Sequence, residues 1–575
     1  MDYTVQTEIG RRSFSQGRGH SLIRPVEDLT LPQILDYIGE HPYDGFMRYH
    51  LREVVDSMGE DGVRAVTERF EETPSAVLFG VLAKTKADKY PFALQALEKA
   101  DPQQLLRYFE EHPDIEIREM MGGPEQDLMN RYWGKIFHDS RENHTPFSEM
   151  KNLTLAIPAD YLDPNGDREY VHVSSLMPKS GDESVRTGTS LRDMNVDETL
   201  ERVEPIIDGI VGDVPILGVG YNKSYMTLVH WDCNLEVSNG KVRYRIKSKQ
   251  GSSGKGTTKE SAAASGIMET LERYSSMMGS PPNWPNVYRS RMQLVRGKHS
   301  DLSKDGVAVL DPNSMNLKCP YSDQDLYWVT GEIYDGNGFR EALLPAQSVF
   351  LLSNLDESEV SIGSSNGLAS GNTMEEAKLH SLFEVIERDG DYSMFYSPDR
   401  CFTIESGDGP MGDILKAYRD KGVEVQFLDL TTEFGVPTYR AFMKLDNGQI
   451  LSGSGTHLDG RIAALRAVCE LSPKCWVYKQ NTRSEPNPAP SDFKPDVMEF
   501  DKLPNYSSGN VNADLQVTEG LMSQNGYPVF YADLTRSDIE IPVVRTIIPG
   551  LDIPSGVSRR QFKHFLQQTG LKLKL

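Results

Sequence analysis

Paired glutamates on helices that follow glycine-rich stretches are the residues of this chain best suited to chemistry. From Gly251 to Ser276, GSSGKGTTKESAAASGIMETLERYSS, a Gly/Ser loop containing Lys255 precedes a run of strong helix formers. Ser265, Glu269 and Glu272 follow at i, i+4 and i+7, so their side chains share one helix face. Stacked carboxylates repel each other unless a cation lies between them, and glycines with a lysine suit a phosphate. The stretch therefore predicts a metal-and-phosphate site, although the Walker spacing is absent.

A second copy of this arrangement occupies Ser364 to Asp389, SSNGLASGNTMEEAKLHSLFEVIERD. A Gly/Asn-rich loop again precedes a helix, and polar residues again stand at i, i+4 and i+7 on one face. An arginine follows the last of them, as Arg273 follows Glu272 in the first copy. The repeated residues are His380, Glu384, Glu387 and Arg388.

The Glu-x-x-Glu-Arg pattern alone does not identify a site. A third instance, Glu198 to Arg202, has no glycine loop before it and is interpreted as an ordinary solvated helix face. Either of the other two helices, taken alone, could also be a surface helix with solvated carboxylates. The prediction depends on loop and helix occurring together twice.

A third helix would add a cation to the site. In GSGTHLDGRIAALRAVCE, Arg466 and Glu470 stand at i, i+4 and share a face. A guanidinium can bind a phosphate through two hydrogen bonds, and Glu470 can join the metal ligands. A simple surface salt bridge is the alternative. Pro473 predicts that this helix ends or kinks near residues 471–472.

These motifs, in this order, resemble the YcaO-domain family over roughly Thr187 to Asp552. The matching stretches are SSGKGTTKESAAASGIMETLERYSS, SNGLASGNTMEEAKLHSLFEVIERD, GSGTHLDGRIAALRAVCE and PVVRTIIPGLD. The resemblance implies a domain that binds ATP and magnesium and activates a peptide backbone amide by phosphorylating its oxygen. Family members often carry a glutamine where this chain has Pro473, which affects any polar contact from that position.

A triphosphate is highly negative, so four helix glutamates can face it only if magnesium ions lie between them. The metal ligands in that scheme are Glu269, Glu272, Glu384, Glu387 and Glu470. The expected nucleotide-binding residues are Lys255, Ser265, Arg273, Arg388 and Arg466. Arg466 and His380 are the expected catalytic residues, although a lone histidine is more often structural.

The resemblance leaves the nucleophile open, because a side chain gives an azoline, sulfide a thioamide and an amine an amidine. The final residues GVSRRQFKHFLQQTGLKLKL contain no Pro-x-Pro-x-Pro, and no paired C-x-x-C motifs mark a fused zinc module. Both observations favour thioamidation of a peptide or protein, with a TfuA-type or sulfur-donor partner. The alternatives are an azoline-forming cyclodehydratase with a separate E1-like leader-binding partner, an accessory factor in ribosomal protein methylthiolation, and a nucleotide-binding scaffold without turnover.

Composition restricts the partners and the compartment. The 575 residues carry a net charge of −23, which argues against a nucleic-acid surface. The five cysteines form no C-x-x-C pair, and no apolar run approaches a membrane span or a signal core. We therefore expect a cytoplasmic protein, with other copies of itself as a further partner to consider.

The elements that must position the site fall into two regions. Residues 1–24 are polar and predict a loose arm, whereas 29–133 has helical periodicity, opened by a capping box at Thr30–Gln33. An echo between the segments at 35–42 and 106–113 suggests stacked helical hairpins, or two helices that both end before a proline. From residue 150, strands and helices alternate, which predicts an α+β fold with mixed sheets and flanking helices. We expect 1–149 to be an all-α partner- or substrate-binding region and 150–575 a YcaO-like catalytic domain.

Overall fold

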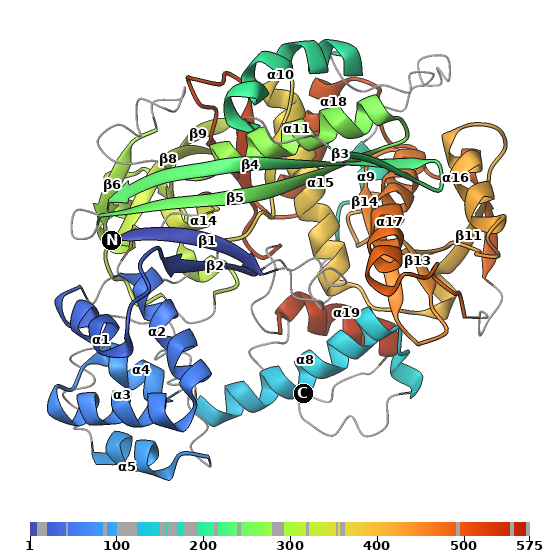
Figure 1. The fold of residues 1–575 in the computed structure, drawn as a ribbon. Helices are drawn as coiled ribbons and strands as arrows, with labels where there is room; N and C mark the ends of the chain where they lie inside the picture. Colours follow the sequence, from blue (N-terminus) through green and yellow to red (C-terminus); the bar gives the residue numbers. More distant parts are fainter. Residues whose placement is uncertain are drawn as a thin grey trace.

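A computed structural model gives the fold of the chain. It describes residues 1–8, 20–41, 44–83, 89–99, 123–149, 157, 169–176, 194–211, 217–238, 243–278, 292–317, 321–351, 355–356, 363–489, 495–551 and 557–570. Within these ranges the strands form three mixed sheets, with helices packed around them (Figure 1). This is the predicted α+β class.

The N-terminal helices begin where the sequence predicts them. The capping box is formed, since the Thr30 backbone N–H donates to Gln33 Oε1 at 2.9 Å. Gly59 separates two of these helices, and its φ of 62° lies in the left-handed region that glycine enters without strain. The helices are α1 (Leu31–Glu40), α2 (Gly45–Met58), α3 (Glu60–Glu72), α4 (Ala76–Ala83), α5 (Pro91–Lys99) and α8 (Gly123–Asn143). The second copy of the 35–42 echo lies outside the described residues.

The prediction of a loose N-terminal arm is wrong for the described part of residues 1–24. Strands β1 (Asp2–Glu8) and β2 (His20–Pro25) pair with each other, and β1 runs parallel to β5 (Arg243–Gly256). Tyr3 is buried, and its hydroxyl donates to Asp44, the residue that caps α2. The pairing partner of β1 is more than 200 residues away, so local composition could not reveal it. This sheet contains strands from both sides of residue 149. The division into two domains at that residue stays a prediction.

The sheet that contains β1 has the order β2-β1-β5-β4-β3, and its long antiparallel pair β4–β5 leads directly into α11. A second sheet has the order β10-β17-β16-β8-β9-β7, with β6 paired to β8. A third has the order β14-β13-β12-β11-β15 and leads from β14 into α17. The remaining strands are β3 (Leu217–Tyr221), β4 (Ser224–Ser238), β6 (Leu294–Gly297), β7 (Ala308–Val309), β8 (Leu326–Tyr334), β9 (Phe339–Pro345), β10 (Leu368–Ser370), β11 (Cys401–Glu405), β12 (Gln426–Asp429), β13 (Thr438–Lys444), β14 (Ile450–Thr456), β15 (Asp496–Glu499), β16 (Val529–Asp533) and β17 (Val543–Ile547).

Helices α11, α15 and α17 lie between these sheets at the centre of the molecule (Figure 1). Extensive apolar clusters bury one side of each helix, so the polar residues on the other side are held rigidly. The helices of this region are α9 (Val173–Leu176), α10 (Val196–Val211), α11 (Lys259–Ser275), α13 (His299–Leu302), α14 (Ala346–Val349), α15 (Met374–Ser393), α16 (Pro410–Arg419), α17 (Gly460–Thr482), α18 (Val511–Gln524) and α19 (Arg559–Thr569).

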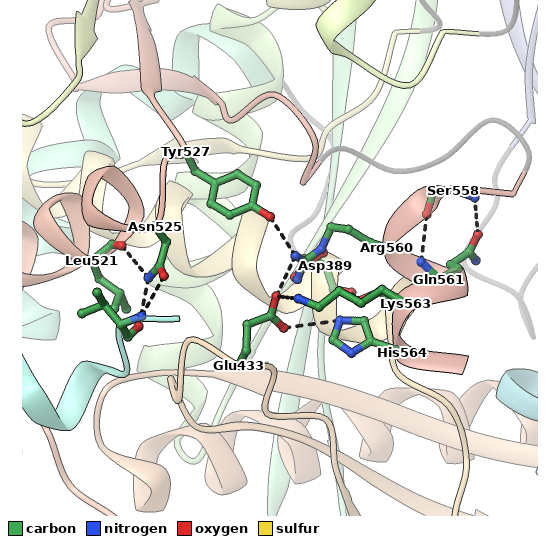
Figure 2. A network of polar contacts seen from close by, with 12 residues as sticks. Asp389, Glu433, Leu521, Asn525, Tyr527, Ser558, Arg560, Gln561, Lys563 and His564 are labelled. Atoms are coloured by element: carbon green, nitrogen blue, oxygen red, sulfur yellow. Dashed lines mark hydrogen bonds and ion pairs between the residues drawn. The ribbon is translucent and has the colours of Figure 1, made fainter. Parts of the chain in front are cut away.

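The last helix, α19, lies beside α8 (Figure 1). An aromatic cluster joins the two helices. Trp133 of α8 lies edge-on to Phe562 and Phe565 of α19, with both ring-centroid separations at 5.2 Å. Charged side chains next to this cluster connect α19 to α15 (Figure 2). Helix α8 therefore packs on the C-terminal end of the chain. No helix in the described ranges is both long and apolar enough to cross a membrane.

Candidate active site

Three helices carry the predicted site residues, and each begins with a side-chain cap just after a strand. The caps are Thr258 for α11, Thr373 for α15 and Asp459 for α17, each accepting a hydrogen bond from a backbone N–H in the first turn. Counting from the caps puts the three helices in one register. Position 7 holds Ser265, His380 and Arg466; position 11 holds Glu269, Glu384 and Glu470; position 14 holds Glu272, Glu387 and Pro473; position 15 holds Arg273, Arg388 and Lys474.

The glycine-rich stretch before α11 is not the loop that the sequence predicts. Residues 251–256 form the end of β5, paired along their whole length with β4. A Cβ on Gly254 would lie 2.0 Å from the backbone nitrogen of Gly266 and 2.1 Å from the carbonyl oxygen of Ala262. Glycine is required because strand and helix backbones touch there. The close approach also lets the Ser253 N–H donate to Glu269 Oε2 at 3.2 Å, so the strand positions a predicted metal ligand.

The same close packing recurs before α17. A Cβ on Gly455 of β14 would lie 2.3 Å from the carbonyl oxygen of Ala463. Helix α17 then continues to Thr482. Of the two outcomes predicted near residues 471–472, an end is therefore wrong, and a kink stays a prediction. Pro473 removes one backbone donor, at a cost of roughly 3 kcal/mol. Burial of the apolar face of α17 against β13 and β14 offsets that loss.

The glutamates of α11 and α15 face each other in a poorly solvated place. Burial raises the pKa of Glu272, and the charges of Glu384 and Glu269 raise it further against the opposing effect of Arg273. Burial likewise raises the pKa of Glu384, with Glu269 adding to it. The pKa of Glu387 rises to about 7, chiefly through burial. These carboxylates are more crowded than their protein cations can fully neutralise.

Helix α17 meets the same cluster from the other side. The charges of Arg466 and Glu470 both affect the pKa of Glu387 on α15. Arg466 Nη2 lies 3.2 Å from His380 Nε2. Lys255 Nζ of β5 lies 2.7 Å from Glu470 Oε1, and this pairing, against the effect of burial, holds the pKa of Glu470 below its usual value. The structure therefore brings together the charged rows of α11, α15 and α17, meaning the polar side chains among positions 7, 11, 14 and 15 of each helix.

The two arginines that follow the glutamate pairs contact their own helices. Arg273 pairs with Glu272 at 2.8 Å and with Glu269 at 3.4 Å. Arg388 lies 4.0 Å from Glu384 and also 4.0 Å from Asp391. Both arginines therefore lie next to carboxylates of their own helices, as local ion pairs do.

Neither Ser265 nor the third Glu-x-x-Glu-Arg pattern forms a hydrogen bond or ion pair with these charged residues in the part of the chain that the structure describes. Ser265 is half-buried and makes no hydrogen bond with another described residue. On α10, Glu198 forms part of the helix cap, accepting from the Asn195 N–H at 2.8 Å. Arg202 donates instead to the Asn372 carbonyl at 2.7 Å and supports the turn that precedes α15.

Sequence reasoning missed three charged residues at the site. Arg545 of β17 is buried beside Glu384, and burial lowers its pKa to about 10 although Glu384 opposes the shift. Its guanidinium donates to the carbonyl oxygens of Ser348 and Asn366 at 2.9 and 2.6 Å. Asp391 and Lys474 are the other two. Arg545 and Asp391 lie within or next to the matching stretches, and Lys474 continues the helix register past the expected end of α17.

Within the described part of the chain, no three His, Cys, Asp or Glu side chains are arranged to hold a metal ion as they stand. Lysine and arginine side chains form ion pairs with carboxylates of the predicted metal-ligand set, as at Lys255–Glu470 and Arg273–Glu272. The donor chemistry nevertheless fits magnesium, which prefers carboxylate oxygens and shares its coordination with phosphate. Crowded glutamates with raised pKa values also indicate that additional positive charge would be favoured here.

Comparison with known proteins identifies the class to which this fold and site belong. The family model described as YcaO cyclodehydratase, ATP- and Mg²⁺-binding, matches residues 253–552. An uncharacterized protein of Methanothermobacter thermautotrophicus is 32% identical over 347 residues, covering 53% of this chain and 84% of that protein. An uncharacterized protein in the tfuA 3′ region of Rhizobium leguminosarum bv. trifolii is 26% identical over 332 residues, covering 52% of this chain and 76% of that protein.

Two solved structures are more distant. A heterocyclase in complex with substrate and cofactor has a TM-score of 0.49 and 20% identity, covering 65% of this chain and 55% of that one. YcaO from Methanopyrus kandleri bound with AMPPCP and Mg²⁺ has a TM-score of 0.46 and 21% identity, covering 63% of this chain and 92% of that one. The chain thus spans about half the length of the heterocyclase. The family match decides the assignment: this chain belongs to the YcaO family, whose members bind ATP and Mg²⁺.

Proposed function

We propose that this protein uses ATP and Mg²⁺ to phosphorylate a backbone amide oxygen of a peptide or protein, and that sulfide then replaces that oxygen. The observation that carries the proposal is the meeting of the α11, α15 and α17 rows, which combines crowded carboxylates with cations. Such a site suits a metal-bound triphosphate, because its carboxylates would hold the metal and the metal would neutralise the phosphate charge. Membership in the YcaO family supports the same chemistry.

The glutamates would hold the metal. Bound Mg²⁺ would supply charge neutralisation and a fixed position for the phosphates. Burial raises the pKa values of Glu272, Glu384 and Glu387, and arriving positive charge would favour their ionised forms. Glu269 is oriented by the Ser253 N–H, whereas Glu470 would first have to share or release Lys255. The proposed metal ligands are Glu269, Glu272, Glu384, Glu387 and Glu470.

The cations would hold the phosphates. Lys255 is bound by a single carboxylate contact, and phosphate oxygens can take over such a contact. Arg273 and Arg388 have similar ion pairs that metal binding to their glutamates would loosen. Ser265 occupies position 7 of α11, as Arg466 does on α17, and would donate a hydroxyl hydrogen bond to the nucleotide or to a metal-bound water.

His380 and Arg466 would act at the reacting amide. A guanidinium has no acceptor, so Arg466 must donate to His380 Nε2, and this assigns the His380 proton to Nδ1. When a phosphate attracts Arg466, Nε2 of His380 becomes available to take a proton from the nucleophile. Arg466 in turn would stabilise charge that develops on the transferred phosphoryl group.

The steps balance without an oxidant or reductant. The amide oxygen attacks the terminal phosphorus of ATP, ADP leaves, and the oxygen becomes part of a phosphate ester. Hydrosulfide adds to the activated carbon and loses its proton, with Nε2 of His380 as the proposed base. The carbon–oxygen bond then breaks, and inorganic phosphate leaves with the original amide oxygen. The products are a thioamide, ADP and phosphate.

Sulfide is proposed as the nucleophile because of the tfuA neighbourhood of the Rhizobium relative. That gene region supports a TfuA-type partner that delivers sulfur. The helices from α1 to α5 form a group beside the N-terminal strands (Figure 1) and contain none of the charged rows, so we propose that they bind the peptide or the partner. A separate leader-binding partner would be needed instead if the product were an azoline.

The experiment follows the oxygen atom. A peptide pool labelled with oxygen-18 in its backbone amides is incubated with the protein, a TfuA-type partner, sulfide and Mg·ATP. A thioamide product is about 14 Da heavier than the labelled peptide, because sulfur replaces oxygen-18, and the label appears in inorganic phosphate, as activation by phosphorylation requires. Label that stays in the peptide while ATP is consumed would exclude this mechanism.

The second candidate function is azoline formation, favoured by the cyclodehydratase description of the matching family. It uses the same phosphorylated amide, but a Cys, Ser or Thr side chain of the substrate attacks it. The product then loses the elements of water, a decrease of about 18 Da for an unlabelled peptide and about 20 Da for the labelled one, and forms without sulfide. Omitting sulfide from the same reaction therefore separates the two functions.

A further inference from the structure

Lys474 occupies the position on α17 that arginine occupies on the two other site helices. It is the fifteenth residue after the cap, as Arg273 is on α11 and Arg388 is on α15. On those helices a glutamate immediately precedes the arginine. On α17 that neighbour is Pro473, so the row keeps its cation but lacks one carboxylate.

The missing carboxylate leaves Lys474 without the ion pairing seen on the other helices. Arg273 pairs with both glutamates of its helix, the closer at 2.8 Å. The glutamate one turn before Lys474 is Glu470, but Glu470 is bound by Lys255 at 2.7 Å. Lys474 itself makes no hydrogen bond and no ion pair within 4.0 Å with any described residue.

The other carboxylate near Lys474 is also neutralised. Asp391 accepts from Arg440 at 2.9 Å and from Ser454 at 2.7 Å. Lys255 and Arg440 repel Lys474, while Glu470 and Asp391 attract it. Burial outweighs the attraction and lowers the pKa of Lys474. A half-buried ammonium among already paired carboxylates leaves this side of the site with excess positive charge, which an anion would neutralise.

We propose that Lys474 binds the phosphate chain of ATP from the α17 side of the site. This inference rests on the proposed function, which supplies the anion. Metal ligands are concentrated on α11 and α15, whereas α17 contributes one glutamate and two cations, Arg466 and Lys474. The three helices would therefore divide the work, with carboxylates holding magnesium on one side and α17 holding phosphate oxygens on the other.

The test measures binding of the Mg²⁺ complex of AMPPCP, a non-hydrolysable ATP analogue, by isothermal titration calorimetry. Lys474→Met should raise the Kd by about tenfold or more, because a charge-assisted contact to phosphate is lost. Lys474→Arg should stay within about threefold of the parent, since it restores the cation. Lys479→Met is the matched control on the same helix, because that lysine pairs with Glu485 at the surface and should not affect binding.

The outcomes separate this inference from the proposed function. Unchanged Kd in Lys474→Met, or equal weakening in Lys474→Met and Lys474→Arg, would overturn the role of Lys474 as a phosphate-binding cation. Absence of Mg·AMPPCP binding by the parent protein would instead contradict the proposed function. Lys474→Gln is measured beside Lys474→Met, and the melting temperature of each variant shows whether weaker binding reflects a damaged fold.

Discussion

Replacing Arg560 should detach α19 from the helix that carries two predicted metal ligands. Arg560 Nε donates to Asp389 Oδ1 at 2.6 Å, and Nη1 donates to Glu433 Oε1 at 2.9 Å and to the Tyr527 hydroxyl at 3.0 Å (Figure 2). The Asp389 side chain is only 3% exposed and directly follows Arg388 on α15. Arg560 therefore neutralises a carboxylate that solvent cannot reach.

The magnitude follows from what each partner retains. In Arg560→Met, Glu433 still pairs with Lys563 at 2.7 Å, but Asp389 loses its cation. Removing one member of a buried pair costs about 3–5 kcal/mol, because the remaining charge is uncompensated. Adding Asp389→Asn removes that charge, so the double variant should recover most of the loss. The expected order of stability is parent, double variant, single variant.

The assay is hydrogen exchange of the α19 amides, measured by mass spectrometry at pH 5 and pH 8. Burial already raises the pKa of Asp389 against the effect of Arg560, and without Arg560 the pKa rises further. A raised folded-state pKa means that the folded protein holds a proton that the unfolded chain releases, so stability falls as pH rises above about 3.9. The exchange of Arg560→Met should therefore be accelerated more at pH 8, by about 100-fold or more. Equal acceleration at both pH values, or a double variant no better than the single one, would refute the reasoning.

Three further predictions concern the site and its support. Glu269→Gln and Glu384→Gln should each abolish Mg-dependent ATP hydrolysis while Glu198→Gln, on the solvated α10 pattern, leaves it unchanged; a phosphate-release assay decides. Deleting residues 29–99 should leave basal ATP hydrolysis but prevent substrate modification, and a variant that still modifies its peptide would contradict a binding role. Burial holds the pKa of His564 near 3, so stability should be lost as pH falls from about 6.5 towards 3; melting curves of His564→Asn should be less acid-sensitive.

The faces of the site helices could be predicted from sequence because helical spacing fixes which side chains lie together. Ser265 through Glu272 and His380 through Glu387 have the expected spacing within capped helices. The strand conformation of the stretch before α11 was harder to predict from sequence, since glycine and serine are typical of loops. Its strand conformation depends on contact between Gly254 and the backbone at Gly266, a tertiary constraint that composition does not express.

Tertiary packing also explains why α17 continues through Pro473. Proline normally ends a helix because it lacks an N–H and crowds the preceding turn. In α17 the residues around it, including Leu471 and Cys475, are completely buried, and that packing favours continuation over the local preference. Strand β1 illustrates the same limit at longer range, because its parallel partner β5 is distant in sequence.

Lys474 can be found from the sequence when residues are counted from the helix caps. Spacing within each motif aligns Glu470 with Glu269 and Glu384, but it gives no reason to look past a proline. Counting from the caps Thr258, Thr373 and Asp459 carries the register through Pro473 and reaches a cation on every helix. Arg545 has no such helical count, since it lies in strand β17 and comes close to Glu384 only through tertiary packing. A helical register can thus reveal a residue that local motifs omit, whereas a contribution from a separate sheet requires the folded structure.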